Sequence, residues 1–445
     1  MIDVTPELLT IIMLGSIFVG VITGFPLAIP IGGVAVILGF LLYGAHSFDL
    51  IFSRIYGLVT NYTLLAVPCF IFMGGMLEHS GIAEKMYDAL YVWLGGLRGG
   101  LAVVTVVIGT VLAATVGIIA ASISMLGMVA LPAMIKRGYD KSLASGTVVA
   151  AGCLGILIPP SIMLIVYGPM AMISVGKLFM AAFPAGFLLS GLYISYIIIR
   201  CIVRPADGPA IPHEERATVS LAKRTTLLLT ATAPTAILIL AVLGVIFLGI
   251  AAPTEAAASG AVVATVLALS YRRLTFKIFT ATALDTFRLT GMILLIGSCA
   301  YAFVGIFLSA GCGNVVEELI LSMPGGKWGA FGIIMFIIFM LGFFIDWIGI
   351  LFIIIPIISP LVEPLGFHPL WFAMMVCVNL QTSFMTPPFA PGIFFLRGTA
   401  SPDLGLSMAD IIRGVIPFIA LVVIGVILII VFPEIILWLP DKMIK

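Results

Sequence analysis

The sequence predicts an all-α protein that crosses a membrane many times and contains two copies of one helical unit. Three observations support this prediction. Of the 445 residues, 62% are hydrophobic and only 9% are charged, long apolar runs follow one another along the chain, and one motif recurs after 228 residues. Soluble domains carry about 25% charged residues. A soluble fold with so few charges could not cover a water-exposed surface, so the composition excludes one.

Apolar runs long enough to cross a bilayer occupy most of the chain. We predict about ten spans, at residues 8–24, 27–43, 60–80, 141–172, 174–203, 224–250, 254–270, 287–309, 368–397 and 411–433. Two other apolar stretches, 101–135 and 328–360, each divide into two arms around a polar or glycine-containing centre. Arms of about a dozen residues do not cross a hydrocarbon core of about 30 Å. This favours two re-entrant hairpins over pairs of short tilted spans.

The positions of Lys and Arg predict the orientation of the chain. If the polar segment 204–222 is cytoplasmic, sixteen of the 21 Lys and Arg residues lie inside and five lie outside. Such a bias follows the positive-inside rule. It places both termini outside, and it lets the first hairpin enter from the cytoplasm and the second from the opposite side.

An internal repeat predicts the domain organisation. Ile158-Pro159-Pro160-Ser161 reappears 228 residues later as Thr386-Pro387-Pro388-Phe389, and the same spacing relates the centres of the two hairpins. We therefore predict a first repeat at 1–203, a linker at 204–222 and a second repeat at 223–445. Each repeat holds five crossings and a hairpin, and an odd number of crossings inverts the second copy. Inverted repeats with interrupted helices are typical of secondary transporters that bind their substrate near the midplane.

The paired prolines predict that 141–172 and 368–397 are broken helices. A double proline removes two backbone donors and interrupts a helix, so the freed carbonyls need a partner. A simple kink would explain one such pair, but it explains two at matching positions less well. Small residues before the first pair leave the backbone accessible, so its carbonyls could bind a cation. In this segment the candidate residues are Gly152, Gly155 and Pro159.

The second broken helix adds polar side chains at the same depth. These candidates are Asn379, Gln381, Thr382, Ser383, Thr386 and the neighbouring Pro387. So many polar groups inside a span are expected to face a cavity or a partner. Alternatively, a single Ser or Thr bonds to a carbonyl of its own helix. For Asn379, Gln381 and Thr386 together, the functional interpretation is favoured.

The hairpin tips supply further candidates. Thr115, Gly117 and Ser122 surround the first tip. Gly117 could simply form the turn and Ser122 could cap the returning arm, and a helix that starts at the midplane also attracts anions. Asp346 in the second hairpin is the acid placed deepest in the membrane. It is a candidate cation ligand or proton carrier, with helix capping as the alternative. Glu255, in the first turn of a span, is interpreted as a capping residue.

Several activities find no support in the sequence. No GxxxxGK[ST], GxSxG or HExxH motif is present, so neither ATP hydrolysis nor another catalytic activity is indicated. Six scattered cysteines include no CxxC pair, which argues against a disulfide framework or a zinc site. A net charge of +1 gives no reason to expect nucleic acid as a partner. The chain is therefore not expected to be an enzyme.

The ordered motifs resemble the large membrane subunit of TRAP transporters, the tripartite ATP-independent periplasmic carriers. They are Leu131-Pro132-Ala133-Met134, Arg137-Gly138-Tyr139-Asp140, Gly155 to Ser161, Tyr167-Gly168, Pro253-Thr254-Glu255-Ala256-Ala257, the Asp346 hairpin and Thr386-Pro387-Pro388. Asp346-Trp347-Ile348-Gly349, together with Asn379 to Ser383, resembles the branch often labelled mannitol/chloroaromatic.

This resemblance implies an elevator-type carrier in a bacterial inner membrane. Two hairpins and two broken helices would form a mobile domain that slides against a scaffold of the other spans. The resemblance also implies a small membrane subunit of about four spans, a periplasmic substrate-binding protein and sodium coupling. By position, the sodium ions would lie at the loops 152–160 and 381–388. Their ligands would come from Gly152, Gly155, Thr382 and Thr386.

One departure from the family bears on the coupling ion. Many members carry Ser-Gly-Ser-Ser at the first hairpin tip, whereas this chain has Val116-Gly117-Ile118-Ile119. Ser122, Thr115 and main-chain carbonyls would then have to supply the ligands. Proton coupling through Asp346 is the alternative.

The sequence thus predicts the permease subunit of a cation-coupled uptake system for a small organic anion. Helix starts at the hairpin tips suit a carboxylate substrate. A stand-alone anion symporter or exchanger is an alternative, and a channel or membrane scaffold is another of a different class.

Overall fold

The computed structural model describes residues 4–210 and 221–442, and every regular element in these ranges is a helix. The predicted all-α class is therefore confirmed. Six of the described helices are long and apolar enough to cross a membrane, or seven if one bent pair forms a single span. Eight further apolar helices have 10–17 residues. The total of about ten spans stays a prediction, because length alone does not decide how these shorter helices sit in a bilayer.

The helices begin and end as follows. In the first half they are α1 (Pro6–Ile22), α2 (Ala28–Tyr43), α3 (His46–Val59), η1 (Tyr62–Leu65), α4 (Ala66–Glu78), α5 (Ile82–Leu94), α6 (Gly100–Val116), α7 (Ile119–Lys136), α8 (Lys141–Cys153), η2 (Leu154–Ile156), α9 (Ile162–Ala171), α10 (Val175–Val203) and η3 (Pro205–Asp207). In the second half they are α12 (Leu221–Ile239), η4 (Leu240–Gly244), α13 (Val245–Phe247), α14 (Pro253–Ser270), α15 (Phe276–Ser309), α16 (Cys312–Leu321), α17 (Gly326–Leu341), α18 (Trp347–Val362), α19 (Pro369–Met385), α20 (Pro391–Thr399), η5 (Pro402–Leu404), α21 (Met408–Val431), α22 (Glu434–Leu437) and η6 (Pro440–Lys442).

Helices of the two halves recur at the spacing of the sequence repeat. α7 and α18 begin 228 residues apart, and so do α8 and α19. One pair differs in shape. α15 is continuous over 34 residues, whereas α3 and η1–α4, the equivalent segment, meet at a 53° bend. Asn61 accepts a hydrogen bond from the Thr63 backbone N–H at this bend, and such a side chain starts a new helix.

Both predicted hairpins consist of two helices, but their arms are longer than the predicted dozen residues. α6 and α7 have 17 and 18 residues, and α17 and α18 have 16 each. The reason is that the first interruption is confined to Gly117 and Ile118, so the apolar sequence on either side stays helical. At about 1.5 Å per residue, α7 is long enough to cross a membrane. Partial entry of the hairpins into the bilayer therefore stays a prediction.

Among the described helices of ten residues or more, α3, α5 and α16 lie outside the predicted spans and hairpins. Each has only 10–14 residues and combines apolar residues with charges such as Arg54, Lys85 and Glu317, so none contains an apolar run long enough to cross a membrane. Their period of 3.6 residues, rather than a continuous apolar run, is the signal that identifies them.

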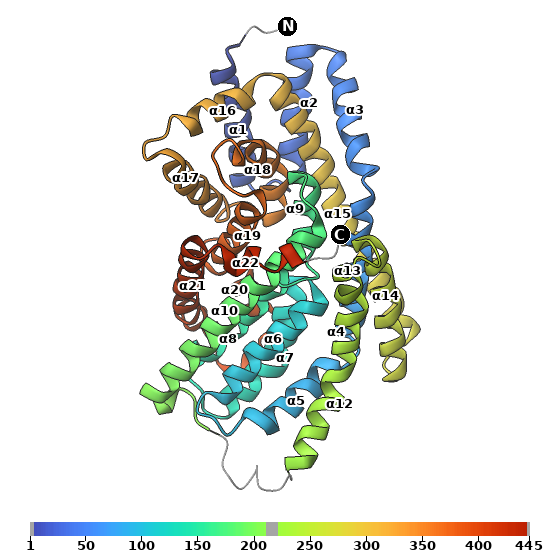
Figure 1. Cartoon of the computed structure of the whole chain (residues 1–445), viewed down its shortest axis with the longest axis vertical. Coiled ribbons are helices and arrows are strands. Elements are labelled where there is room, and N and C mark those ends of the chain that lie inside the picture. The colour runs from blue at the N-terminus through green and yellow to red at the C-terminus, as the bar shows by residue number, and fades with distance from the viewer. Residues whose placement is uncertain (1–3, 211–220, 443–445) are drawn as a thin grey trace.

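The helices pack in two groups (Figure 1). In one group, α2, α3 and α4 surround α15, and α14 packs on α4. In the other, α8 lies against α6, α7 and α21, while α19 contacts α17, α10 and α21. Gly146 of α8 faces the Gly414 carbonyl of α21 so closely that a side chain at either position would overlap the other backbone. Small residues permit such close contacts between membrane helices.

Candidate functional site

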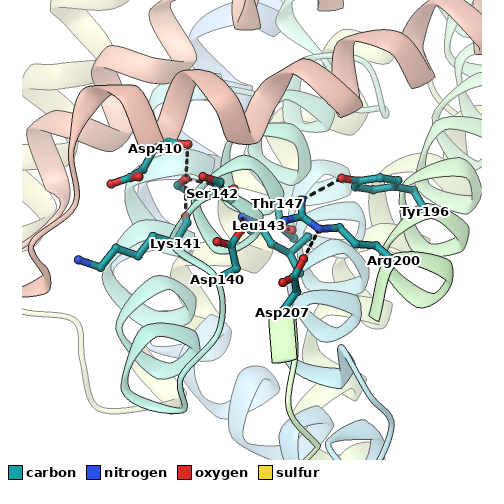
Figure 2. Close-up of polar contacts among 10 residues, drawn as sticks. Asp140, Lys141, Ser142, Leu143, Thr147, Tyr196, Arg200, Asp207 and Asp410 are labelled. Carbon is teal, nitrogen blue, oxygen red and sulfur yellow. Dashed lines mark hydrogen bonds and ion pairs between the residues drawn. The ribbon is translucent and has the colours of Figure 1, made fainter. Parts of the chain in front are cut away.

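The start of the first broken helix is fixed by a polar network (Figure 2). Arg200 of α10 donates hydrogen bonds to Asp140 at 2.9 Å, to Asp207 at 2.8 Å and to the Tyr196 hydroxyl at 3.0 Å. Asp140 also accepts from the Leu143 backbone N–H at 2.8 Å and thereby caps α8. Because one guanidinium joins α8, α10 and the start of the linker, these three segments are held together.

Further contacts join α8 to the start of α21. Lys141 donates to the Gly405 carbonyl at 2.6 Å, and Ser145 reaches the Asp410 carbonyl at 3.5 Å. Beside this region, the Tyr139 hydroxyl accepts from the Leu101 backbone N–H at the start of α6. Burial raises the pKa of Tyr139 to about 12, so this hydroxyl stays protonated at neutral pH. The bases of the hairpin and of the broken helix are therefore tied together.

The first broken helix is interrupted where the sequence predicts. α8 continues as a 3₁₀ turn to Ile156, and α9 begins only at Ile162. Ser161 caps α9, accepting from the Leu164 N–H and donating to the Ile156 carbonyl. Both double prolines have a cis peptide bond between their two prolines.

The hairpin tips pack directly on the broken helices. Gly117 has φ +69°, and a Cβ there would lie 2.8 Å from the Pro160 carbonyl oxygen. A Cβ on Gly155 would lie 2.6 Å from the Ser122 Oγ. In the first half the serine belongs to the hairpin and the glycine to the broken helix. In the second half the glycine, Gly342, belongs to the hairpin, and it faces Ser383 of α19. In each half, then, a serine hydroxyl occupies the space that a glycine leaves open.

The two tips and the two interruptions surround one cavity of about 280 Å³. Helices α4 and α15 complete its wall. It is lined by Ile71, Gly117, Ile118, Ile119, Ala120, Ile156, Ile162, Leu289, Met292, Ile293, Asp346, Trp347, Ile348, Phe389, Pro391 and Phe395. Among these lining residues, Asp346 is the only ionisable one. We call this space the central cavity.

Of the predicted site residues, Gly117 and Asp346 line the central cavity. Three others use their hydroxyls within their own helices, since Thr115, Thr382 and Thr386 donate to the carbonyls three or four residues earlier at 2.6–2.9 Å. Each threonine thus makes the hydrogen bond within its own helix that is predicted as the alternative to a functional role. Asn379 instead reaches across to α17 and donates to the Met335 carbonyl at 2.8 Å.

Three predicted residues carry buried polar atoms without a hydrogen-bond partner among the described residues. They are the Oγ of Ser122, the Nε2 of Gln381 and the Oγ of Ser383. Buried polar groups are almost always hydrogen-bonded, so each of these marks a position where a ligand could bind. Oxygen ligands of this kind suit a hard cation. The Gln381 nitrogen is a donor and does not. Of the three, only the hydroxyl oxygens of Ser122 and Ser383 have the chemistry of a cation ligand.

The remaining predicted residues lie in close helix contacts or in the interruptions themselves. Gly152 lies against Ile123 of α7 so closely that a Cβ there would lie 2.3 Å from the Ile123 Cγ1 and 3.0 Å from its Cα. Pro159 and Pro387 interrupt the two broken helices next to the central cavity. Outside the cavity, Glu255 accepts from the Ala252 N–H at 3.2 Å in the first turn of α14, as predicted for a capping residue.

Asp346 lies at the N-cap position of α18. Its carboxylate is near the backbone N–H groups of Trp347 and Ile348, but it makes no capping hydrogen bond of regular geometry. The equivalent position of the first half, at the N-cap of α7, is Ile118. The two hairpin tips thus present different side chains to the same cavity.

A second cavity of about 400 Å³ adjoins the first and shares Ile71, Ile118, Ala120 and Leu289 with it. Its wall combines apolar residues with ionisable side chains from α4, α15 and the residue that follows α4. These are Glu78, His79, Asp285 and Arg288. Arg288 and Asp285 form an exposed ion pair at 3.5 Å. We call this space the vestibule. The orientation predicted from the Lys and Arg distribution places it on the cytoplasmic side.

Comparison with known proteins identifies the family. Residues 14–435 match the family described as "Tripartite ATP-independent periplasmic transporter, DctM component". The chain belongs to this TRAP permease family. It is 30% identical to the large permease protein of a C4-dicarboxylate TRAP transporter from Vibrio cholerae serotype O1, over 97% of each chain. It is 28% identical to the large permease protein of an ectoine TRAP transporter from Halomonas elongata, over 97% of this chain and 99% of that protein.

The fold of this TRAP permease also resembles a solved transporter. The crystal structure of the YdaH transporter from Alcanivorax borkumensis superposes with a TM-score of 0.62 at 18% identity, over 97% of this chain and 98% of that one. The predicted family is confirmed, and so is a multi-pass location in the inner membrane. The mannitol/chloroaromatic branch stays a prediction.

Sequence reasoning missed the parts of the TRAP permease site that come from α4 and α15. Ile71, Leu289, Met292 and Ile293 line the central cavity, but apolar residues of a span give no signal that separates a cavity wall from a lipid-facing surface. The sequence did contain an indication of the vestibule, since Glu78 and Asp285 are acids within or beside predicted spans. Because both lie near span ends, where charged residues are common, neither was recognised as part of a site.

Proposed function

We propose that this chain is the large permease of a sodium-coupled uptake system for a small organic anion with a carboxylate group. It would act with a small membrane subunit of about four spans and a periplasmic binding protein that delivers the substrate. Family membership supports a transport role, and the relatives named above are C4-dicarboxylate and ectoine transporter permeases.

One observation carries this proposal: the tips of both hairpins and the interruptions of both broken helices meet around a single cavity. Interrupted helices that converge from two inverted repeats are the usual setting of a substrate site in secondary transporters. In this mechanism the hairpins and broken helices move together past α4 and α15, which line the cavity from the scaffold. Such an elevator movement would expose the central cavity to each side of the membrane in turn.

Sodium would be held by Ser122 beside Gly155 and by Ser383 beside Gly342. These serines supply hydroxyl oxygens, and the interrupted helices supply carbonyls. A bound sodium ion would place a positive charge near the hairpin tips and couple uptake to the sodium gradient. The two serine–glycine contacts themselves hold each hairpin tip against its broken helix.

Proton coupling is the second candidate, and it is favoured by one specific residue. Among the described residues that line the central cavity, Asp346 is the only ionisable one. An acid in a membrane-embedded cavity is a candidate proton carrier.

The test is uptake into proteoliposomes that contain the permease with its small subunit, with the binding protein added outside. Labelled succinate and labelled benzoate serve as substrates. We expect an inward sodium gradient to drive uptake, and Ser122→Ala or Ser383→Ala to raise the sodium concentration required. Uptake that follows a proton gradient and is lost in Asp346→Asn would replace sodium coupling. Uptake that is unchanged without the binding protein and small subunit would support a stand-alone symporter. Conductance without saturation would support a channel.

A further inference from the structure

We propose that the substrate is a monocarboxylate with an apolar body, such as an aromatic or branched aliphatic acid. This inference rests on the proposed function, because it names the substrate class of the central cavity. The permeases of C4-dicarboxylate and ectoine transporters are among the relatives of this chain. The cavity of this chain points to a different type of molecule.

The wall of the central cavity is almost entirely apolar. Fourteen of its sixteen lining residues have hydrocarbon, thioether or aromatic side chains, and none of the sixteen is Ser, Thr, Asn, Gln, His, Lys or Arg. A polyhydroxylated acid placed there would lose its hydrogen bonds to water without replacement by side chains. An apolar body loses no such bonds, and it gains from leaving water.

Aromatic rings form one part of this wall. Trp347 begins α18, Phe389 lies in the second interruption, and Phe395 belongs to α20. Met292 of α15 also lines the cavity, and thioether groups adapt their shape to a flat ring or a branched chain. The volume of about 280 Å³ lies near the lower end of small-molecule sites, which limits the substrate to a compact molecule.

The charges around the cavity leave room for one carboxylate. α7 begins at Ile119 without a side-chain cap, so its first backbone N–H groups can interact with an anion. At the equivalent position α18 carries Asp346, which repels a second carboxylate at that end. Ile118 and Ala120, on either side of this helix start, line both the cavity and the vestibule. The single acid group is therefore oriented toward the start of α7, with the apolar body inside the cavity.

Ligand binding by the purified permease and small subunit in nanodiscs tests this inference. Cyclohexanecarboxylate is compared by calorimetry with cyclohexane-1,4-dicarboxylate, which adds one carboxylate, and with a polyhydroxylated cyclohexanecarboxylate. We expect the first ligand to bind at least about tenfold more tightly than either of the others. Equal or tighter binding of the dicarboxylate or the polyhydroxylated acid would overturn the inference.

Two variants and one matched control locate the binding site. Met292→Gln adds a polar group to the cavity wall and should weaken cyclohexanecarboxylate binding. Leu295→Gln is its matched control, since Leu295 belongs to the same helix, is 58% exposed and does not line the cavity. Asp346→Asn should reduce the ratio by which cyclohexanecarboxylate binds more tightly than cyclohexane-1,4-dicarboxylate. Equal effects of the two glutamine variants, or an unchanged preference in Asp346→Asn, would contradict the assignment.

The outcomes separate this inference from the proposed function. Sodium-driven uptake of succinate together with weak binding of cyclohexanecarboxylate would leave the function intact and remove the substrate class. Tight binding of cyclohexanecarboxylate without uptake driven by any ion gradient would support the substrate class and contradict the proposed ion-coupled uptake.

Discussion

The two halves of the molecule repeat their backbone but differ in chemistry at the positions that meet at the centre. The N-cap of α7 is Ile118, and the N-cap of α18 is Asp346. The buried serine belongs to the hairpin in the first half and to the broken helix in the second. The repeated backbone therefore places the starts of α7 and α18 in one cavity, and these two starts differ in their N-cap side chains. One start remains open to an anion, whereas the other carries an acid.

Adding an acid to the open helix start should have the largest effect. Ile118→Asp would place a second carboxylate in the central cavity, and we expect uptake of benzoate in proteoliposomes to fall by at least about 100-fold. The neutral variant Ile118→Asn, of almost the same shape, is the control and should lose much less. Equal losses in both variants would show that the size of the side chain, and not its charge, distinguishes the two tips.

The broken helices also begin differently, and the next prediction concerns this contrast. The N-cap of α8, Asp140, is bound by Arg200, whereas the equivalent of Arg200 in the second half is Leu428. Arg200→Leu should lower the free energy of unfolding by about 2–3 kcal/mol, because two partly buried carboxylates lose their partner. Thermal unfolding of the purified protein measures this change.

Two controls separate the network from the charge of Arg200. Arg200→Lys keeps the charge but not the planar fork, so it should fall between the wild type and Arg200→Leu. Arg204→Leu removes an exposed arginine at the end of the same helix and should change stability by less than about 0.5 kcal/mol. A wild-type melting temperature in Arg200→Leu would show that α8 is held by packing alone.

The sequence predicts the interruptions better than the cavity that they surround. The start of α8 was predicted at its observed residue, and that of α19 within one residue, because an N-cap residue and a proline mark them locally. The bend between α3 and α4 was missed, since Asn61 is one polar residue in an apolar run. The wall from α15 could not be predicted, because a membrane span is apolar on lipid-facing and cavity-facing sides alike.

The exchanged serines allow the proposed ion sites to be compared between the halves. Ser122→Ala and Ser383→Ala should each raise the sodium concentration for half-maximal uptake by about tenfold, since each removes one oxygen ligand. Ser190→Ala is the control, because its hydroxyl already bonds to the Gly186 carbonyl and to Thr110 away from the tips. If only one variant changes sodium dependence, only one half binds the ion. If neither does, the serines are not ligands.

The smallest expected effect concerns Trp371, whose contacts hold the start of α19 as the Arg200 network holds the start of α8. Trp371, the equivalent of Leu143, donates to the Ile429 carbonyl of α21 at 3.1 Å and packs against Phe331 and Phe367. Trp371→Phe keeps the ring packing and removes one hydrogen bond, so we expect a loss of about 1 kcal/mol in thermal unfolding experiments. Trp371→Leu loses the ring contacts as well and should cost more. If both variants lose the same amount, the hydrogen bond rather than the aromatic cluster holds the second broken helix in place.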